Sequence, residues 1–343
     1  MGGHVDVCDD CGWQQPSYNS CRNRHCPKCQ GSAQAEWLAA REERLLPVPY
    51  FHVVMTLPSA LRPLARANPR ALYGLLLRAA NETLLELAAE PKWMGGTPGI
   101  TSVLHTWRRD LLLHPHVHSV VTGGGLSPDG TRWVSRGAGR FLFPVKVIGR
   151  LFRGKMLAGL VALRDAGELC GVDDPQTFAA LKDRLYRKDW VVYAKRPFAG
   201  AEQVFGYLGR YTHRVGLSDH RLLAVDDEAV TWKTRGDGTA TAAPVEFIRR
   251  LLQHVLPQGF VKIRHAGLYA ASNVNTRLAR ARALLVDESS PVVERTFHLD
   301  AILAEVLAMP IASCPLCGGQ LVNRPLPSTG AASCRAPPTG SLP

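Results

Sequence analysis

The middle of the chain alternates between strand-like and helix-like patterns. Runs rich in β-branched and aromatic residues predict strands at 50–58, 100–107 and 116–124. Leucines at helical spacing predict one or two amphipathic helices within 60–90, and a further helix is predicted at 143–169. The glycines and Asp-Gly pair that follow the third strand indicate a turn or hairpin tip.

The same mixture continues into the second half of the chain. The pattern predicts a strand at 190–198, a helix at 201–215, a hairpin with an acidic turn at 221–234, a helix that starts at Pro244 and a strand at 260–267. Hairpin signals are frequent, and no glycine-rich phosphate loop follows a strand. We therefore predict an α+β fold with an antiparallel or mixed central sheet and helices on its faces.

Three parts are expected along the chain. Residues 1–46 form a cysteine-rich head and a linking helix, and residues 47–285 form the large central domain. Residues 286–343 comprise a helix, a CxxC pair and a disordered tail rich in Pro, Gly and Ser.

Charge and composition narrow the class of partner. The chain has 343 residues, is 46% hydrophobic and carries a formal net charge of +12, which favours a polyanion such as nucleic acid. No apolar run reaches the 18 residues of a membrane span, and the N-terminus has no secretory signal pattern. We expect a cytoplasmic protein that associates with the nucleoid in use.

Cysteines gather near both ends of the chain, in a pattern typical of metal binding in a reducing compartment. Cys8 and Cys11 form one CxxC pair, and Cys26 and Cys29 form a second, fourteen residues later. Two such pairs complete a tetrahedral four-cysteine zinc site, which is normally structural. Further ligands for this head, or for a second ion, are available at His4, Cys21 and His25.

The tail holds half of another such site. Cys314 and Cys317, in CPLCGG, have no second pair beside them. Three alternatives are open: the pair is the remnant of a zinc ribbon, it binds a metal together with Cys334, or it packs against another part of the protein.

Two histidines share one face of a predicted strand. Residues two apart in a strand point the same way, so His116 and His118 project together. Two neighbouring imidazoles suit a divalent cation, although hydrogen-bonded core histidines are the alternative. His114 has the same parity, but Pro115 is expected to interrupt the strand before it.

Two tyrosines share one face of a predicted helix. Tyr207 and Tyr211 are four residues apart, and Arg210, His213 and Arg214 surround them. A positioned tyrosine oxygen is a competent nucleophile toward phosphorus. Aromatic packing in a core is the alternative for such a pair.

These motifs together resemble a known superfamily. His116-Val117-His118 resembles the histidine–hydrophobe–histidine signature of the HUH endonucleases, whose members carry one or two tyrosines on a later helix. The segments NSCRNRHCPKCQ, HTWRRDLLLHPHVH and YLGRYTHRV resemble, in that order, the rolling-circle insertion-sequence transposases of the two-tyrosine type, which have a zinc-binding head. The sequence departs from that group at Arg108, where glycine is common.

The resemblance implies a ferredoxin-like antiparallel sheet and a specific chemistry. His116 and His118, with a third ligand for which Gln203 is a candidate, would hold Mg²⁺ or Mn²⁺. Tyr207 or Tyr211 would attack single-stranded DNA at element ends and target, giving a 5′-phosphotyrosine without any nucleotide cofactor. Arg210 and Arg214 would bind phosphates.

Other functions fit parts of the sequence. A replication initiator or relaxase would use the same chemistry, but classical relaxases cluster three histidines and lack the zinc head. A zinc-ribbon DNA-binding protein without catalysis would use the histidines and tyrosines only for packing. A metal-dependent hydrolase is disfavoured, because no HxHxD or HExxH motif is present.

Overall fold

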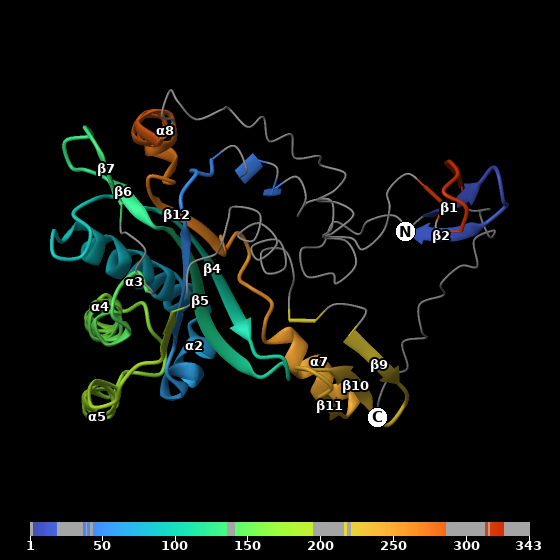
Figure 1. Cartoon of the computed structure of the whole chain (residues 1–343). Coiled ribbons are helices and arrows are strands. Elements are labelled where there is room, and N and C mark those ends of the chain that lie inside the picture. The colour runs from blue at the N-terminus through green and yellow to red at the C-terminus, as the bar shows by residue number, and fades with distance from the viewer. Residues whose placement is uncertain are drawn as a thin grey trace, which may run out of the picture.

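The fold is taken from a computed structural model of the chain (Figure 1). The structure describes residues 3–18, 37–38, 40–41, 44–135, 141–194, 216–217, 221–285, 313–314 and 316–325. Within these residues, no helix is long and apolar enough to cross a membrane.

A five-stranded sheet forms the centre of the described structure. Its strand order is β12-β4-β5-β3-β8, and every neighbouring pair is antiparallel. The strands are β3 (Tyr50–Thr56), β4 (Gly99–Trp107), β5 (Leu113–Thr122), β8 (Val192–Ala194) and β12 (Ile263–Gly267). The predicted α+β class with a central antiparallel sheet is therefore confirmed.

Helices cover one face of this sheet. The apolar side chains of β5 that point to this face, among them Val117 and Val121, join a single core with leucines of the helices. Figure 1 shows α3 and α4 lying beside the sheet. The elements on this side are η1 (Ser59–Leu61), α2 (Arg62–Ala67), α3 (Pro69–Ala89), α4 (Val145–Asp165) and α5 (Pro175–Tyr186).

The opposite face of the sheet is divided into an apolar part and a polar part. Near β12, Tyr50, Val103 and Val120 pack with Tyr269 in a second core. The hydroxyls of Tyr50 and Tyr269 lie 2.7 Å apart and are hydrogen-bonded. Three short helices close this end: η3 (Ala271–Asn273), the π-helical η4 (Val274–Leu278) and α8 (Ala279–Leu285). The polar part, farther along β4 and β5, carries histidines.

A small three-stranded sheet packs against the loop between β4 and β5. Its core holds Trp232, which is fully buried, together with Leu111 and Leu217. The indole N–H of Trp232 donates to the carbonyl of Arg109 at 3.1 Å. The elements are β9 (Leu222–Val225), β10 (Val230–Lys233), β11 (Thr239–Ala242) and α7 (Pro244–Leu252).

Two further strand pairings lie outside these layers. The hairpin predicted after β5 is formed by β6 (Gly124–Leu126) and β7 (Trp133–Ser135). A terminal sheet has the order β13-β1-β2, from β1 (Gly3–Cys8), β2 (Gln14–Tyr18) and β13 (Leu321–Pro325). Strand β13 was not predicted from the sequence, because its five residues follow a glycine pair and lack a strong apolar alternation.

Three other elements differ from the sequence-based expectation. Strand β5 begins at Leu113, so Pro115 lies inside it and does not interrupt it. Pro115 has no N–H to donate to the neighbouring strand, but its carbonyl accepts a hydrogen bond from Leu57 N–H at 3.0 Å. Strand β8 begins at Val192, two residues later than predicted, and residues 195–198 of the predicted strand lie outside the described residues. Strand β11 was missed because Thr239–Ala242 has only small side chains.

Helices α3 and α4 pack closely at Gly159. A Cβ atom there would overlap the side chain of the buried Leu75, whereas one on Gly154, also in α4, would meet nothing within 4 Å. We expect Gly159→Ala to be at least about 1 kcal/mol less stable than Gly154→Ala, which should gain about 0.5–1 kcal/mol from helix propensity. Urea unfolding of both variants measures this difference, and equal stabilisation would contradict the close packing.

Candidate functional site

Three histidines from two neighbouring strands converge on one face of the central sheet. His116 and His118 lie two residues apart on β5, and His105 on β4 pairs directly with His116. Directly opposed residues in an antiparallel pair project to the same face. One ring nitrogen from each histidine lies within 4.8 Å of those of the other two.

Hydrogen bonds at Nδ1 orient two of these rings. His116 Nδ1 donates to the carbonyl of His114 at 2.6 Å, which leaves Nε2 as the ring's lone-pair nitrogen. His118 Nδ1 is hydrogen-bonded at 2.9 Å to Nε2 of the buried His52 on β3. Such partners fix the orientation of metal-binding imidazoles. The Nε2 atom of His116 is therefore a candidate ligand atom, and so is that of His118 in the tautomer whose Nδ1 donates to His52.

Burial keeps the central imidazole neutral. It lowers the pKa of His116 to about 4, although the hydrogen bond to the His114 carbonyl acts in the opposite direction. Burial and the charges of Arg62 and Arg108 also lower the pKa of His114. A neutral imidazole is the form that binds a metal ion, and near pH 7 His116 is already in that form.

The histidines form one wall of an open cleft of about 690 Å³. Trp107 lines it as well, and its ring stacks on His105 with centroids 4.8 Å apart and planes at 15°. Most charged side chains in the lining are basic, and Asp110 is the acidic exception. The lining residues are His105, Trp107, Arg108, Arg109, Asp110, His114, His116, His118, Thr234, Arg235, Thr239 and Ala240.

The small sheet supplies the facing wall and is held there by arginines. Arg109 donates to the carbonyl of Thr234 at 3.0 Å, and Arg221 donates to the carbonyl of Arg109 at 2.8 Å. The first bond ties the β10–β11 turn, and the second ties the start of β9, to the loop between β4 and β5. The cleft is thus framed by two sheets, with imidazoles on one side and Arg235 on the other.

Several predicted site residues lie outside the described residues. Tyr207, Tyr211, Gln203, Arg210 and Arg214 all belong to residues 195–215, and their roles stay predictions. The residues on either side of that range, Ala194 and Gly216, are described.

Residues 195–215 are called the tyrosine segment below. Directly before this segment, Ala194 pairs with Val53 in the central sheet. On the other side, a Cβ on Gly216 would lie 3.8 Å from Trp107 and 3.0 Å from Leu111. The described ends of this segment therefore lie on the sheet and beside the cleft.

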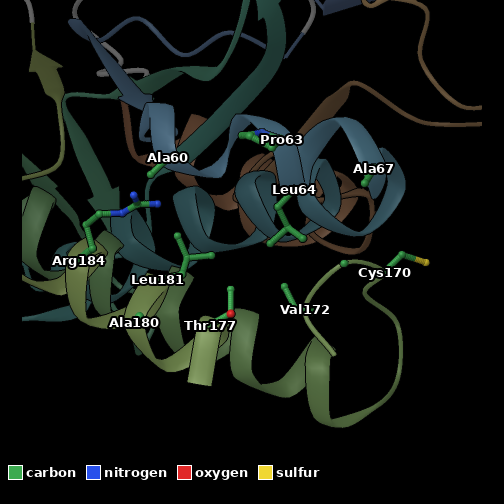
Figure 2. Close-up of a pocket in the computed structure, with 11 residues that line it drawn as sticks. Ala60, Pro63, Leu64, Ala67, Cys170, Val172, Thr177, Ala180, Leu181 and Arg184 are labelled. Atoms are coloured by element: carbon green, nitrogen blue, oxygen red, sulfur yellow. The ribbon is translucent and has the colours of Figure 1, made fainter. Parts of the chain in front are cut away.

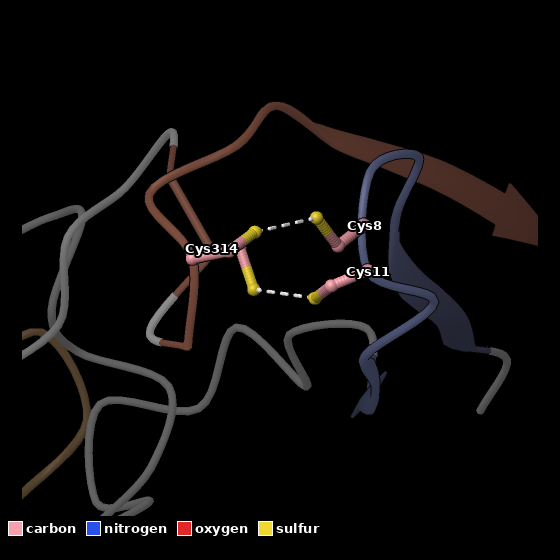
Figure 3. Close-up of side chains that lie close together, drawn as sticks. Cys8, Cys11 and Cys314 are labelled. Atoms are coloured by element: carbon pink, nitrogen blue, oxygen red, sulfur yellow. Dashed lines mark hydrogen bonds between the residues drawn. The ribbon is translucent and has the colours of Figure 1, made fainter.

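Four cysteines from the two ends of the chain form a second cluster (Figure 3). Cys8 Sγ lies 3.4 Å from Cys317 Sγ, and Cys11 Sγ lies 3.5 Å from Cys314 Sγ. The predicted partners Cys26 and Cys29, and the nearby Cys21 and His25, lie outside the described residues, so their part stays a prediction.

His4, another suggested ligand, is not in the cysteine cluster. Its Nε2 lies 3.5 Å from a carboxylate oxygen of Asp6 on the same strand. The tail pair Cys314 and Cys317 is the half-site whose use the sequence left open, and the structure brings it to the N-terminal pair.

Sequence reasoning missed His105 as a member of the histidine cluster. The signal was present, because His105 lies in the predicted strand 100–107, which a short segment joins to the strand of His116. A hairpin between these two strands would place residues of one strand opposite residues of the other, but the sequence pattern does not show which residues pair. The register that selects His105 depends on a bulge between His105 and Trp107, which the pattern did not reveal.

A second, mostly apolar cavity lies between α2 and α5 (Figure 2). It has a volume of about 650 Å³ and shares no lining residue with the histidine cleft. Arg184 is its one charged lining residue, and the sulfur of Cys170 points away from the cavity in Figure 2. Nothing in this lining supports catalysis.

The fold and the clusters define an α+β protein with a three-histidine site and a cysteine-rich terminal sheet. A family model described as a putative transposase matches residues 99–277, which include the histidine cluster and the tyrosine segment. The model of a transposase zinc-binding domain matches residues 1–57. The chain belongs to this family of transposases, as the resemblance in the sequence indicated.

Two relatives agree with this assignment. A protein named putative transposase y4qJ, from Sinorhizobium fredii, is 44% identical over 94% of this chain and 85% of its own length. The transposase for insertion sequence element IS801, from Pseudomonas savastanoi pv. phaseolicola, is 28% identical over 89% of this chain and 74% of its own. No solved structure matches the chain.

His254 should make the stability of the fold depend on pH. It is buried, its Nε2–H donates to the carbonyl of Leu111, and its Nδ1 is hydrogen-bonded to the hydroxyl of Thr106. Burial lowers its pKa to about 4. Because the folded pKa lies below the unfolded value of about 6.5, the stability present above that value is lost as the pH falls toward 4.

We expect His254→Gln to remove this contribution. Between pH 7.5 and pH 5 the wild type should lose about 2 kcal/mol more free energy of unfolding than the variant, since glutamine does not titrate. Urea unfolding at both pH values measures the difference. Equal losses would mean that His254 does not oppose protonation in the folded state.

Proposed function

We propose that this transposase cleaves and rejoins single-stranded DNA, using Tyr207 and Tyr211 as nucleophiles and a divalent cation at the histidine cluster. The observation that carries the proposal is the convergence of His105, His116 and His118 in an open, basic cleft. The DNA would come from the ends of the mobile element and from its target.

The histidine cluster fits a divalent cation. Its rings offer three nitrogen ligands on one side, and the cleft leaves the other side open for a phosphate oxygen. We assign His105 as the third ligand in preference to Gln203, because it comes from the strand paired with β5. Three imidazoles suit a transition ion, so Mn²⁺ should be preferred to Mg²⁺. When bound, the ion polarises the scissile phosphate and stabilises charge in the transition state.

The tyrosines are close enough along the chain to reach this cluster. Gly216 lies beside Trp107, which stacks on His105. Tyr211 is five residues before Gly216, so its Cα is at most about 18 Å from that of Gly216. Chain length limits the distance of the Tyr207 Cα from the Cα atoms of Gly216 and Ala194 in the same way.

The reaction needs no external energy source. A tyrosine oxygen bonds to phosphorus, and the bond from phosphorus to the 3′ oxygen breaks. The phenol proton leaves the tyrosine, and the 3′ oxygen departs as a hydroxyl. The 5′-phosphotyrosine conserves the energy of the phosphodiester, so the reverse attack by a 3′-hydroxyl joins strands. Two tyrosines allow a second cleavage before the first link is resolved.

The cleft also fits single-stranded nucleic acid. Arg108, Arg109 and Arg235 supply positive charge along its walls, and Trp107 offers an aromatic face beside the cation site. Arginines bind phosphates, and aromatic rings stack on unpaired bases regardless of sequence. Arg210 and Arg214 would add to this basic surface from the tyrosine segment.

The first test is the covalent adduct. Labelled single-stranded oligonucleotides from the element ends should give a metal-dependent DNA–protein adduct on a denaturing gel. Tyr207→Phe/Tyr211→Phe should abolish the adduct, and the exposed Tyr186→Phe should leave it unchanged. His105→Ala should lower the rate about 100-fold or more at limiting Mn²⁺, with partial recovery at high Mn²⁺, because a ligand is lost.

Two outcomes would contradict these assignments separately. An adduct that survives in the double tyrosine variant means that another residue is the nucleophile. A rate unchanged by His105→Ala, while His116→Ala removes activity, means that the third ligand lies elsewhere.

The second test is the salt dependence of DNA binding. Removing two phosphate-binding arginines with Arg108→Ala/Arg235→Ala should reduce the slope of log K against log salt by about 1.4 for single-stranded DNA. Arg150→Ala, on the exposed side of α4, removes a charge away from the cleft and should leave the slope within error. Fluorescence anisotropy at several salt concentrations measures both, and equal slopes would place the DNA elsewhere.

A further inference from the structure

The two ends of the chain meet at one group of four thiols. Cys8 ends β1 and Cys11 follows it, whereas Cys314 and Cys317 precede β13, yet all four Sγ atoms lie within 4.8 Å of one another. A tetrahedral zinc with Zn–S bonds of about 2.3 Å needs Sγ atoms about 3.8 Å apart. The Sγ–Sγ distances between the N-terminal and C-terminal pairs, 3.4 and 3.5 Å, are close to this separation.

The two cysteine pairs have the same backbone structure. In each pair, the residue after the second cysteine is a glycine in the left-handed region, with φ of 74° at Gly12 and 75° at Gly318. Gly12 N–H donates to the carbonyl of Cys8 at 3.0 Å, and Gly318 N–H donates to the carbonyl of Cys314 at 2.8 Å. Glycine adopts this conformation without strain, so each pair closes into a tight turn.

A second set of hydrogen bonds repeats in the same way. Cys8 N–H donates to the carbonyl of Trp13, five residues on, at 2.8 Å. Cys314 N–H donates to the carbonyl of Gly319, also five residues on, at 2.7 Å. Two turns that match in both bonds and face each other are the two halves expected of a closed four-cysteine zinc site.

Strand pairing joins the same two segments. Strand β13 pairs with β1 from His4↔Pro325 to Cys8↔Leu321, so β1 is the middle strand of the terminal sheet. Gly319 packs directly against the Asp10 side chain, and a Cβ there would overlap the carboxylate. The C-terminal segment therefore contacts the N-terminal segment through strand pairing and backbone packing as well as through the cysteine side chains.

We propose that the structural zinc of this protein is held jointly by Cys8, Cys11, Cys314 and Cys317, so that the zinc-binding domain is completed by the end of the chain. The site then closes a loop of about 300 residues, since Cys11 and Cys314 are 303 positions apart. Residues 1–57, which the zinc-binding model matches, hold only half of this site. A copy that lacks the tail would lose zinc binding at the N-terminal pair.

Zinc analysis of the purified full-length protein tests this sharing. Cys314→Ser/Cys317→Ser should contain one zinc fewer per chain than wild type, and Cys8→Ser/Cys11→Ser should lose the same one. The variant with all four substitutions should lose no more than either pair alone. Cys170→Ser, an exposed cysteine outside the cluster, is the control and should keep the wild-type content.

The competing arrangement gives a different pattern. If Cys26 and Cys29 complete the N-terminal site, Cys314→Ser/Cys317→Ser keeps the wild-type zinc content, and the proposal is overturned. If the four-substitution variant loses two zinc ions while each pair loses one, the pairs bind separate ions, and the proposal is again overturned.

A cut chain tests the link without relying on how cysteine variants fold. A site for a sequence-specific protease, inserted after Ser290, separates residues 291–343 from the rest. After cleavage, this fragment should stay with the body on gel filtration and leave when a chelator removes zinc. With Cys314→Ser/Cys317→Ser it should leave without a chelator. The proposal fails if the wild-type fragment leaves while zinc stays behind, or if it stays equally well after all zinc is removed.

Discussion

The register between β4 and β5 determines the site. It places His105 opposite His116 and directs His118 to the same face, while Val117 and Val121 enter the core under the helices. A slip by one residue would exchange the two sets and bury imidazoles beneath α3. Buried polar contacts on the helix side oppose such a slip: Ser102 Oγ lies 2.7 Å from Ser119 Oγ and donates to Asn81 Oδ1 at 2.6 Å. These bonds would be lost in any other pairing.

The histidine cluster lies where the sheet changes from buried to open. Burial lowers the pKa of His116 and keeps its lone pair available, while the open cleft that the histidines line admits solvent and ligands. The bulge after His105 turns Trp107 so that it stacks on the imidazole and lines the cleft. A fully buried cluster could not meet a phosphate, and a fully exposed one would be protonated near pH 6.5.

The sequence predicted local features well and long-range partners less well. A run rich in β-branched residues predicted the strand of His116 and His118, and leucine spacing predicted the helix at α3, because these signals arise from local propensity and from which face is buried. Partner choice has no such signal. His105 depends on a register set by a bulge, and the meeting of Cys8 with Cys317 joins residues 309 apart. Strand β13 also escaped prediction, since Leu321–Pro325 forms a strand only against β1.

The two clusters differ in a way that matches different roles. Four thiols that surround one point leave no position for another ligand, so an ion there can only hold segments together. Three imidazoles that approach from one side leave the remaining positions facing a cleft lined with arginines. An ion at the second cluster would therefore be able to exchange water for a phosphate oxygen, as the proposed cleavage requires. The geometry of the ligands, more than their number, supports the proposed structural role of the cysteines and the proposed catalytic role of the histidines.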